Sequence, residues 1–247
     1  MLLVRVLLLT LVPALAAPAG ASAAWSAATP VPLSTDAMWP AATVDGRGDL
    51  AVAWIQESRS GGHATVRVRA AFRAAGATRF SVRTLVAGRD LAARGAAVAL
   101  DGRGELTVAW IEQASDNGRT HGHKTVRAAF RTPTGRWSPT QAVGRSSAFN
   151  YAAPRLAATP GGTVVLTYNA RVAAAPGVAA AWRSRGHRFG AIQAVPTGHG
   201  YLLDPTLAYD PAGRAFLTGT QGCDSRQSSA VLFTGRPGVA GSARARS

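Results

Sequence analysis

The chain has 247 residues, of which 47% are hydrophobic and 16% charged, and its formal net charge is +15. This length and hydrophobic content exclude an intrinsically disordered chain and suit one domain with its own core. Cys223 is the only cysteine, which excludes an internal disulfide but leaves a free thiol or a link to another chain. We expect Cys223 to be an ordinary, partly buried small residue.

The positive charge does not by itself indicate nucleic-acid binding. Of the 27 basic residues, 26 are arginines, with Lys124 the only lysine, and they are spread through the chain. A nucleic-acid-binding protein usually gathers its basic residues into a patch or carries a recognised motif, and neither is present here. The charge predicts salt-sensitive, non-specific attraction to anionic polymers, and no specific nucleic-acid partner.

Residues 1–23 have the pattern of a secretory signal peptide. Arg5 supplies the positive start, residues 6–15 the apolar stretch, and residues 21–23 (Ala-Ser-Ala) the small-residue cleavage pattern. The apolar stretch is shorter than the ~20 residues that a membrane span requires, and Pro13 interrupts it. The segment therefore predicts export to the extracellular space, with an uncleaved anchor as the alternative and no later membrane span.

The rest of the chain is built from a repeat of about 55 residues. Residues 42–55 and 98–111 are nearly the same sequence, offset by 56 positions, and further copies begin at Pro154 and Pro205. Spacings of 56, 58 and 51 separate the glycines of the first turn in the four copies: Gly48, Gly104, Gly162 and Gly213.

Each copy contains the same order of short segments. An apolar run meets a tight turn such as Asp-Gly-Arg-Gly. A second run then alternates between two faces, as strands do. A third run ends in an aromatic residue followed by arginine, and a fourth opens with an aromatic residue. The pattern predicts an all-β fold, a β-propeller of about four four-stranded antiparallel blades. The second strands are expected near residues 49–55, 105–111, 163–168 and 214–218.

The two ends of the repeat array complement each other. Residues 25–31 match residues 137–143, so the array begins with a fourth strand that lacks its first three. The last copy has three strands and no recognisable fourth. We predict that residues 25–32 pair with residues 229–234 and close the propeller. The alternative is a fragment of a larger propeller. The repeat domain spans residues 24–235, and residues 236–247 are expected to be a disordered tail.

The best candidate ligand-binding residues lie in the connections between blades, which gather on one face around the central channel of a propeller. Exposed aromatic rings beside Asn and Asp suit stacking on sugars and recognition of their hydroxyl groups. The alternative is that these residues only seal the channel. The candidates are Trp39, Asn150, Tyr151 and Tyr201, with Asp36 and Asp204 nearby.

For three other sets of residues we favour a role other than ligand binding. Aspartate at the first turn is an ordinary hairpin residue. The arginines that end the third strands are expected to cover the blade surface or to bond loop carbonyls. A His-Gly-His segment can bind a metal ion, but a solvated loop is the simpler interpretation, and we expect no metal or other cofactor. These sets are Asp45, Asp101 and Asp210; Arg73, Arg131 and Arg183; and His121 with His123.

Residues 99–110, 126–131 and 135–141 together resemble the repeats of secreted bacterial propellers that are grouped with sialidase-like propellers. The resemblance covers residues 25–234 and implies the propeller fold. Sialidases carry a Ser-x-Asp-x-Gly-x-Thr-Trp box before the fourth strand, whereas the corresponding turn at residues 74–80 lacks the Ser and Asp. The family's tyrosine nucleophile and arginine triad therefore have no counterparts that can be named here.

These observations favour an exported β-propeller that acts as a binding or scaffold module for a cell-surface glycan or protein. One alternative is a glycoside-processing enzyme whose catalytic acids are not identified. Another is a basic surface protein that binds polyanions. No nucleophile elbow, P-loop or zinc-protease motif favours any other enzyme class.

Overall fold

The computed structural model describes residues 36–60, 63–89, 91–116, 119–146, 153–172, 175–195, 202–221 and 229–235. These residues form fifteen β-strands and no helix, which confirms the all-β prediction. No described segment is a helix long and apolar enough to span a membrane. The predicted signal peptide, the closing segment 25–32 and the tail 236–247 lie outside the described residues.

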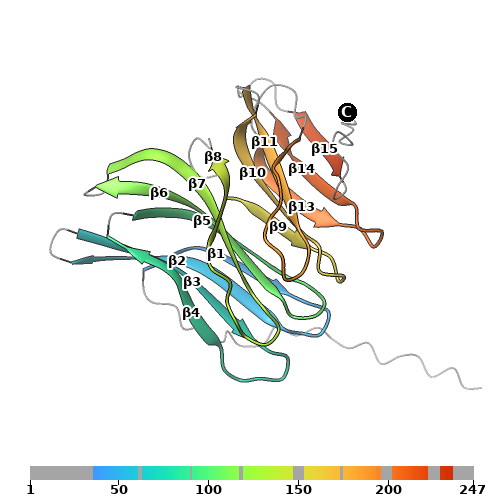
Figure 1. The fold of residues 1–247 in the computed structure, drawn as a ribbon, viewed down its shortest axis with the longest axis horizontal. Helices are drawn as coiled ribbons and strands as arrows, with labels where there is room; N and C mark the ends of the chain where they lie inside the picture. The colour runs from blue at the N-terminus through green and yellow to red at the C-terminus, as the bar shows by residue number, and fades with distance from the viewer. Residues whose placement is uncertain are drawn as a thin grey trace, which may run out of the picture. The chain divides into compact units, whose positions relative to one another are not determined.

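The strands form four antiparallel sheets, each assembled from strands that are consecutive in the sequence (Figure 1). The first sheet contains β1 (Ala37–Val44), β2 (Leu50–Ser60), β3 (His63–Arg73) and β4 (Ser81–Gly88). The second contains β5 (Leu91–Leu100), β6 (Leu106–Asp116), β7 (Arg119–Arg131) and β8 (Gln141–Ser146). The third contains β9 (Arg155–Ala158), β10 (Val164–Val172), β11 (Ala175–Arg183) and β12 (Gln193–Val195). The fourth contains β13 (Leu202–Tyr209), β14 (Ala215–Gln221) and β15 (Ser229–Gly235).

The predicted second strands are confirmed as β2, β6, β10 and β14. The fourth sheet has three strands among the described residues, as the sequence of the last copy predicts. The expected pairing of residues 25–32 with β15 stays a prediction. Four blade-type sheets of this kind make up a propeller or a fragment of one.

Neighbouring sheets pack through large side chains on one face and small ones on the other. Trp110 and Val108 of β6 share a buried cluster with Ala51 and Ala53 of β2. On the opposite face of β6, Ala109 belongs to the cluster formed with the third sheet. Because consecutive residues of a strand point to opposite faces, the alternation of large and small residues allows each sheet to interdigitate with the next.

The third sheet repeats this arrangement. Tyr168 and Leu166 of β10 occupy the positions equivalent to Trp110 and Val108, and they pack in one cluster with Ala109 and Ala128 of the second sheet. A smaller cluster joins Val178 of the third sheet to strands of the fourth. The core is therefore a series of layers between sheets, as expected for a repeat whose units bury their faces only against neighbours.

Candidate functional site

An open depression of about 570 Å³ lies at the end of the first sheet where β1 begins and β2 ends. Its size falls within the ~300–1,000 Å³ that is usual for small-molecule sites. Two acids and one arginine give it a largely polar and charged character, which suits a hydroxyl-rich ligand better than an apolar one. The lining residues are Asp36, Ala37, Met38, Glu57 and Arg59.

The strand register brings two acidic residues together in this depression. Ala37 lies opposite Gln56, and the Glu57 N–H donates to the Asp36 carbonyl oxygen at 3.3 Å. Asp36 and Glu57 are therefore directly opposite each other. Residues so placed project from the same face of the sheet, with Cβ atoms ~4.5–5.5 Å apart.

Arg59 partly neutralises this pair of like charges. Its Nε and Nη2 atoms each lie 2.9 Å from Oε1 of Glu57. The Arg59 side chain is 80% exposed and that of Glu57 27% exposed. An ion pair this open to water contributes only ~0–1 kcal/mol, so a ligand can displace the guanidinium group without a large penalty.

Trp39 follows the depression along β1 in an unusual backbone conformation. The ladder with β2 is interrupted between Met38 and Ala41, and Trp39 has φ of 47°. A bulky residue in this region is held against a strain of ~1–3 kcal/mol, a feature that concentrates at functional sites. The indole is partly buried against the core between the first two sheets.

The second sheet has the same bulge without the strain. Its ladder is interrupted between Arg94 and Ala97, and Gly95, equivalent to Trp39, has φ of 59°. Glycine adopts this conformation readily because it lacks a Cβ atom. Ala92 and Gln113 stand opposite each other there, in place of Asp36 and Glu57. The acids, the strained tryptophan and Arg59 are therefore features of the first sheet that the repeat does not require.

Of the four ligand-binding residues predicted from the sequence, the structure describes only Trp39. Asn150, Tyr151 and Tyr201 lie outside the described residues, so their convergence on one face stays a prediction. Sequence reasoning missed Glu57. The available signal was its departure from the repeat, since position 113 carries the neutral Gln.

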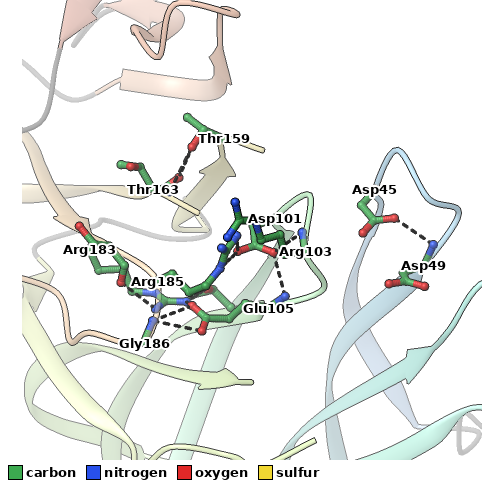
Figure 2. Close-up of polar contacts among 12 residues, drawn as sticks. Asp45, Asp49, Asp101, Arg103, Glu105, Thr159, Thr163, Arg183, Arg185 and Gly186 are labelled. Carbon is green, nitrogen blue, oxygen red and sulfur yellow. Dashed lines mark hydrogen bonds and ion pairs between the residues drawn. The ribbon is translucent and has the colours of Figure 1, made fainter. Parts of the chain in front are cut away.

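The arginine that ends β11 forms a buried bond between sheets (Figure 2). Nη2 of Arg183 donates to Oε1 of Glu105 and to Oγ1 of Thr107, each at 2.6 Å, and its Cζ lies 4.4 Å from the Phe130 ring centroid. Burial lowers the pKa of the Arg183 guanidinium, and Glu105 opposes that shift. An arginine remains charged regardless, so this is a buried ion pair.

Arg131 repeats the contact one sheet earlier. Its Cζ lies 4.1 Å from the Phe72 ring centroid of the first sheet. Burial lowers the pKa of Arg131, and the nearby Asp49 carboxylate raises it. The expectation that these arginines bond loop carbonyls is confirmed for Arg131 and Arg183, which donate to the carbonyl oxygens of Thr132 and His187. Of the two expected roles Arg183 takes only the second, because it is 3% exposed and its partner acid Glu105, from the preceding sheet, lies with it between the layers.

The turn aspartates organise their own hairpins, as predicted. Oδ1 of Asp101 accepts the N–H groups of Arg103 and Glu105 at 2.8 and 2.9 Å. Asp45 makes the equivalent bonds in the first sheet. In the fourth sheet the backbone N–H of Arg214 is the main reason that the pKa of Asp210 is lowered.

Asp101 also bonds across sheets. Its Oδ2 lies 2.8 Å from Nε and 2.5 Å from Nη2 of Arg185, in the turn after β11. As Figure 2 shows, Asp101 and Glu105 thus both meet residues of the third sheet, which include the N–H of Gly186. These acids are occupied by structural bonds and are not free to act on a ligand.

The predicted absence of a metal site stays a prediction. Within the described part of the chain, no group of three His, Cys, Asp or Glu residues is arranged to hold a metal ion. His123 is exposed.

Several solved structures resemble this fold. The chain superimposes on the "Hadza microbial sialidase Hz136" with a TM-score of 0.56 and 14% identity, over 83% of this chain and 45% of that one. For the GH93 α-L-arabinofuranosidase of Fusarium graminearum the TM-score is 0.55 at 10% identity, over 85% of this chain and 66% of that one. For a protein of unknown function from Dyadobacter fermentans the TM-score is 0.54 at 12% identity, over 78% of this chain and 51% of that one.

These similarities show the fold. The described sheets share the architecture of sialidase-like propellers and other propeller glycoside hydrolases. The chain spans about half to two thirds of the length of these proteins. No family model matches the sequence, and no curated protein matches it.

Proposed function

We propose that this protein is an exported glycan-binding propeller module, with the depression beside Trp39 as its contact site. One observation carries the proposal. Asp36, Glu57 and Arg59 line an open depression where β1 begins and β2 ends, and Asp36 lies three residues before a tryptophan held at positive φ. Carboxylates accept hydrogen bonds from sugar hydroxyls, a guanidinium group donates to them, and an indole offers a stacking face.

The fold supports a ligand of this class without specifying it. Fold alone does not determine function, and the likeness to glycoside hydrolases adds only that this architecture can present a carbohydrate site. Export rests on the sequence of residues 1–23. A cell-surface protein is the alternative partner. No catalysis is needed for the arrangement to bind sugars.

The test uses residues that the second sheet carries at the same positions. Trp39→Gly and Glu57→Gln exchange each residue for a residue type that the fold already accepts, because Gly95 and Gln113 are their equivalents. A glycan array probed with the secreted protein should show binding that the double variant loses, while circular dichroism shows that the variant is folded. Relief of the strained φ only partly offsets the lost packing of the partly buried indole. Val44→Ala is the control, because Val44 is 64% exposed at the other end of β1.

Array binding that survives in the double variant contradicts the site, and no binding by the wild-type protein contradicts the function. A lower melting temperature with no glycan bound by either protein means that Trp39 only packs the core.

A glycoside-processing enzyme is the second candidate, and the facing acids Asp36 and Glu57 are the observation that favours it. Glycosidases use two carboxyl groups ~5–10 Å apart, and Asp36 and Glu57 stand opposite each other where β1 begins and β2 ends. Release of the chromophore from nitrophenyl glycosides, abolished by Glu57→Gln with binding retained, would support catalysis. If the protein binds the glycans that the array identifies but hydrolyses none of them, the enzyme proposal is contradicted and the binding module remains.

A further inference from the structure

The end of the sheets opposite the depression carries a different charge pattern. This end contains the turn between the first and second strands of each sheet and the turn between the third and fourth strands of the first three sheets. We call it the turn face and define it by residues 45–49, 74–80, 101–105, 132–138, 159–163, 184–190 and 210–214. Contacts between neighbouring turns, such as Arg185 with Asp101, show that the turns of adjacent sheets meet on one face.

The carboxylates of the turn face are withdrawn from water. Asp101 and Glu105 have side chains 1–2% exposed, bonded to arginines of the third sheet. Asp45 and Asp49 are held by backbone N–H groups and by Arg47, and Asp210 is bonded to Arg214. None of the five acids on this face is exposed.

The arginines of the same turns are on the outside. Six of them are exposed, and they are distributed over all four sheets. Four of the six form no ion pair with any described carboxylate. The exposed arginines are Arg47, Arg79, Arg103, Arg136, Arg188 and Arg214, and those without an ion pair are Arg79, Arg103, Arg136 and Arg188.

We propose that the turn face is a second binding surface, for an anionic polysaccharide that bears repeated sulfate or carboxylate groups. The guanidinium group forms paired hydrogen bonds with such planar or tetrahedral oxyanions. Stacked sheets pack ~10 Å apart, so a polymer crossing the turns meets a new guanidinium group at about that interval. A small anion would use only one of them.

The composition of the face distinguishes this ligand from other polyanions. Proteins that bind single-stranded nucleic acid combine basic grooves with exposed aromatic rings on which bases stack. The aromatic residues of these turns are Phe80, Trp137 and Phe189, and none is exposed. The same absence of exposed aromatic groups in the described turns removes the usual anchors for a membrane interface. What the turn face presents to a partner is charge.

The proposal does not depend on the glycan site, because the two surfaces lie at opposite ends of the strands. A face-specific interaction must be distinguished from the effect of net charge, which is large for this protein. We therefore compare two variants that each remove four arginines and lower the formal charge from +15 to +11 (15 − 4). The turn-face variant carries Gln at 79, 103, 136 and 188. The control carries Gln at 83, 89, 145 and 171, which are exposed arginines outside these turns.

Binding is measured by titration with fluorescent heparin, a sulfated polysaccharide, and with polygalacturonate, a carboxylated one, at increasing NaCl concentrations. The wild-type protein should bind at least one of them with a steep salt dependence. The turn-face variant should bind about tenfold or more weakly and with a smaller salt slope, since each exposed contact contributes a modest increment. The control variant should lose less than threefold. The preferred anionic group is that of the polysaccharide whose affinity falls more between the wild-type protein and the turn-face variant.

Three results would overturn the proposal. Equal losses in both variants would mean that net charge alone is responsible. Tighter binding to a thymidine oligonucleotide or to phosphatidylglycerol vesicles than to either polysaccharide would assign the face to another partner. If the wild-type protein binds neither polysaccharide, the turn face is not a binding surface for them. Circular dichroism confirms folding, and a variant with only Arg103→Gln and Arg136→Gln repeats the comparison if the fourfold variant is unfolded.

Discussion

Replacing Arg183 with methionine should strongly destabilise the protein. Arg183 is 3% exposed, and its Nη2 atom holds both Glu105 and Thr107 at 2.6 Å. Methionine fills much of the same volume but leaves Glu105, 2% exposed, without its counter-ion. Removing one partner of a buried ion pair typically costs ~3–5 kcal/mol. At about 2–4 °C per kcal/mol for a domain of this size, the melting temperature should fall by about 6–20 °C.

The equivalent arginine of the first sheet provides the matched control. Arg73 lies over Phe80 of its own sheet, 5.0 Å from the ring centroid, and has no ion pair among the described residues. Arg73→Met should therefore cost less than ~1 kcal/mol. The free energy of unfolding is measured by urea titration followed by circular dichroism.

A second substitution tests the cause of the loss. Adding Glu105→Gln to Arg183→Met removes the uncompensated charge, so the double variant should recover at least half of the lost stability. If Arg183→Met costs no more than Arg73→Met, or if the double variant is less stable than the single one, the buried ion pair does not hold these sheets together.

Two further predictions concern positions buried between strands or sheets. Gly95→Ala should lower the free energy of unfolding by ~2–4 kcal/mol, because the new Cβ atom would lie 2.6 Å from Cα of Ala153 at a backbone φ of +59°. Gly76→Ala is the control, because nothing lies within 4 Å of a Cβ atom added there. It should lose only ~1 kcal/mol, the cost of a positive φ, in the same urea titration. Equal losses of stability in the two variants would contradict the close approach of Ala153 to Gly95. Tyr168→Phe should change stability by less than ~1 kcal/mol or increase it, since the buried hydroxyl has no described partner. Burial raises the Tyr168 pKa from 10.0 to about 12. The stability that this shift contributes is therefore fully present below pH 10 and is lost as the pH rises through 12. Ultraviolet titration of the wild-type protein should show a tyrosine that ionises late, and Tyr168→Phe should lack it.

The repeat made the sheets predictable from the sequence. The spacing of the turn aspartates and glycines located β2, β6, β10 and β14 within a few residues, because a tight turn and a period of two are local signals. The start of the fourth strand was less predictable. Trp137 forms an isolated bridge with Arg131, and β8 begins only at Gln141, since Pro139 has no N–H to donate to a ladder.

The contacts between sheets were not predictable in the same way. Glu105 and Arg183 are 78 positions apart, and nothing in either segment indicates that they meet. Their contact follows from the stacking of successive sheets, which places the end of β11 over the start of β6. The Asp36–Glu57 pair needed the register of β1 on β2, and a shift of one residue would have put the two side chains on opposite faces.

The distribution of repeated and unrepeated residues separates structure from candidate function. At and beside the turn face, an aspartate recurs in the first turn of the first, second and fourth sheets, and an arginine ends the third strand of the first three. These residues close hairpins and, at Arg131 and Arg183, contact the preceding sheet. At the other end of the strands, Trp39 and Glu57 have the neutral counterparts Gly95 and Gln113, and the second sheet forms the same bulge and ladder with them. The bulge and the ladder therefore do not depend on a strained tryptophan or on facing acids, although the Trp39 indole contributes to the core between the first two sheets. On the proposed function, selection for a ligand would account for both departures at once, and the variant that restores the repeat, Trp39→Gly with Glu57→Gln, tests this by asking whether a folded protein without them still binds.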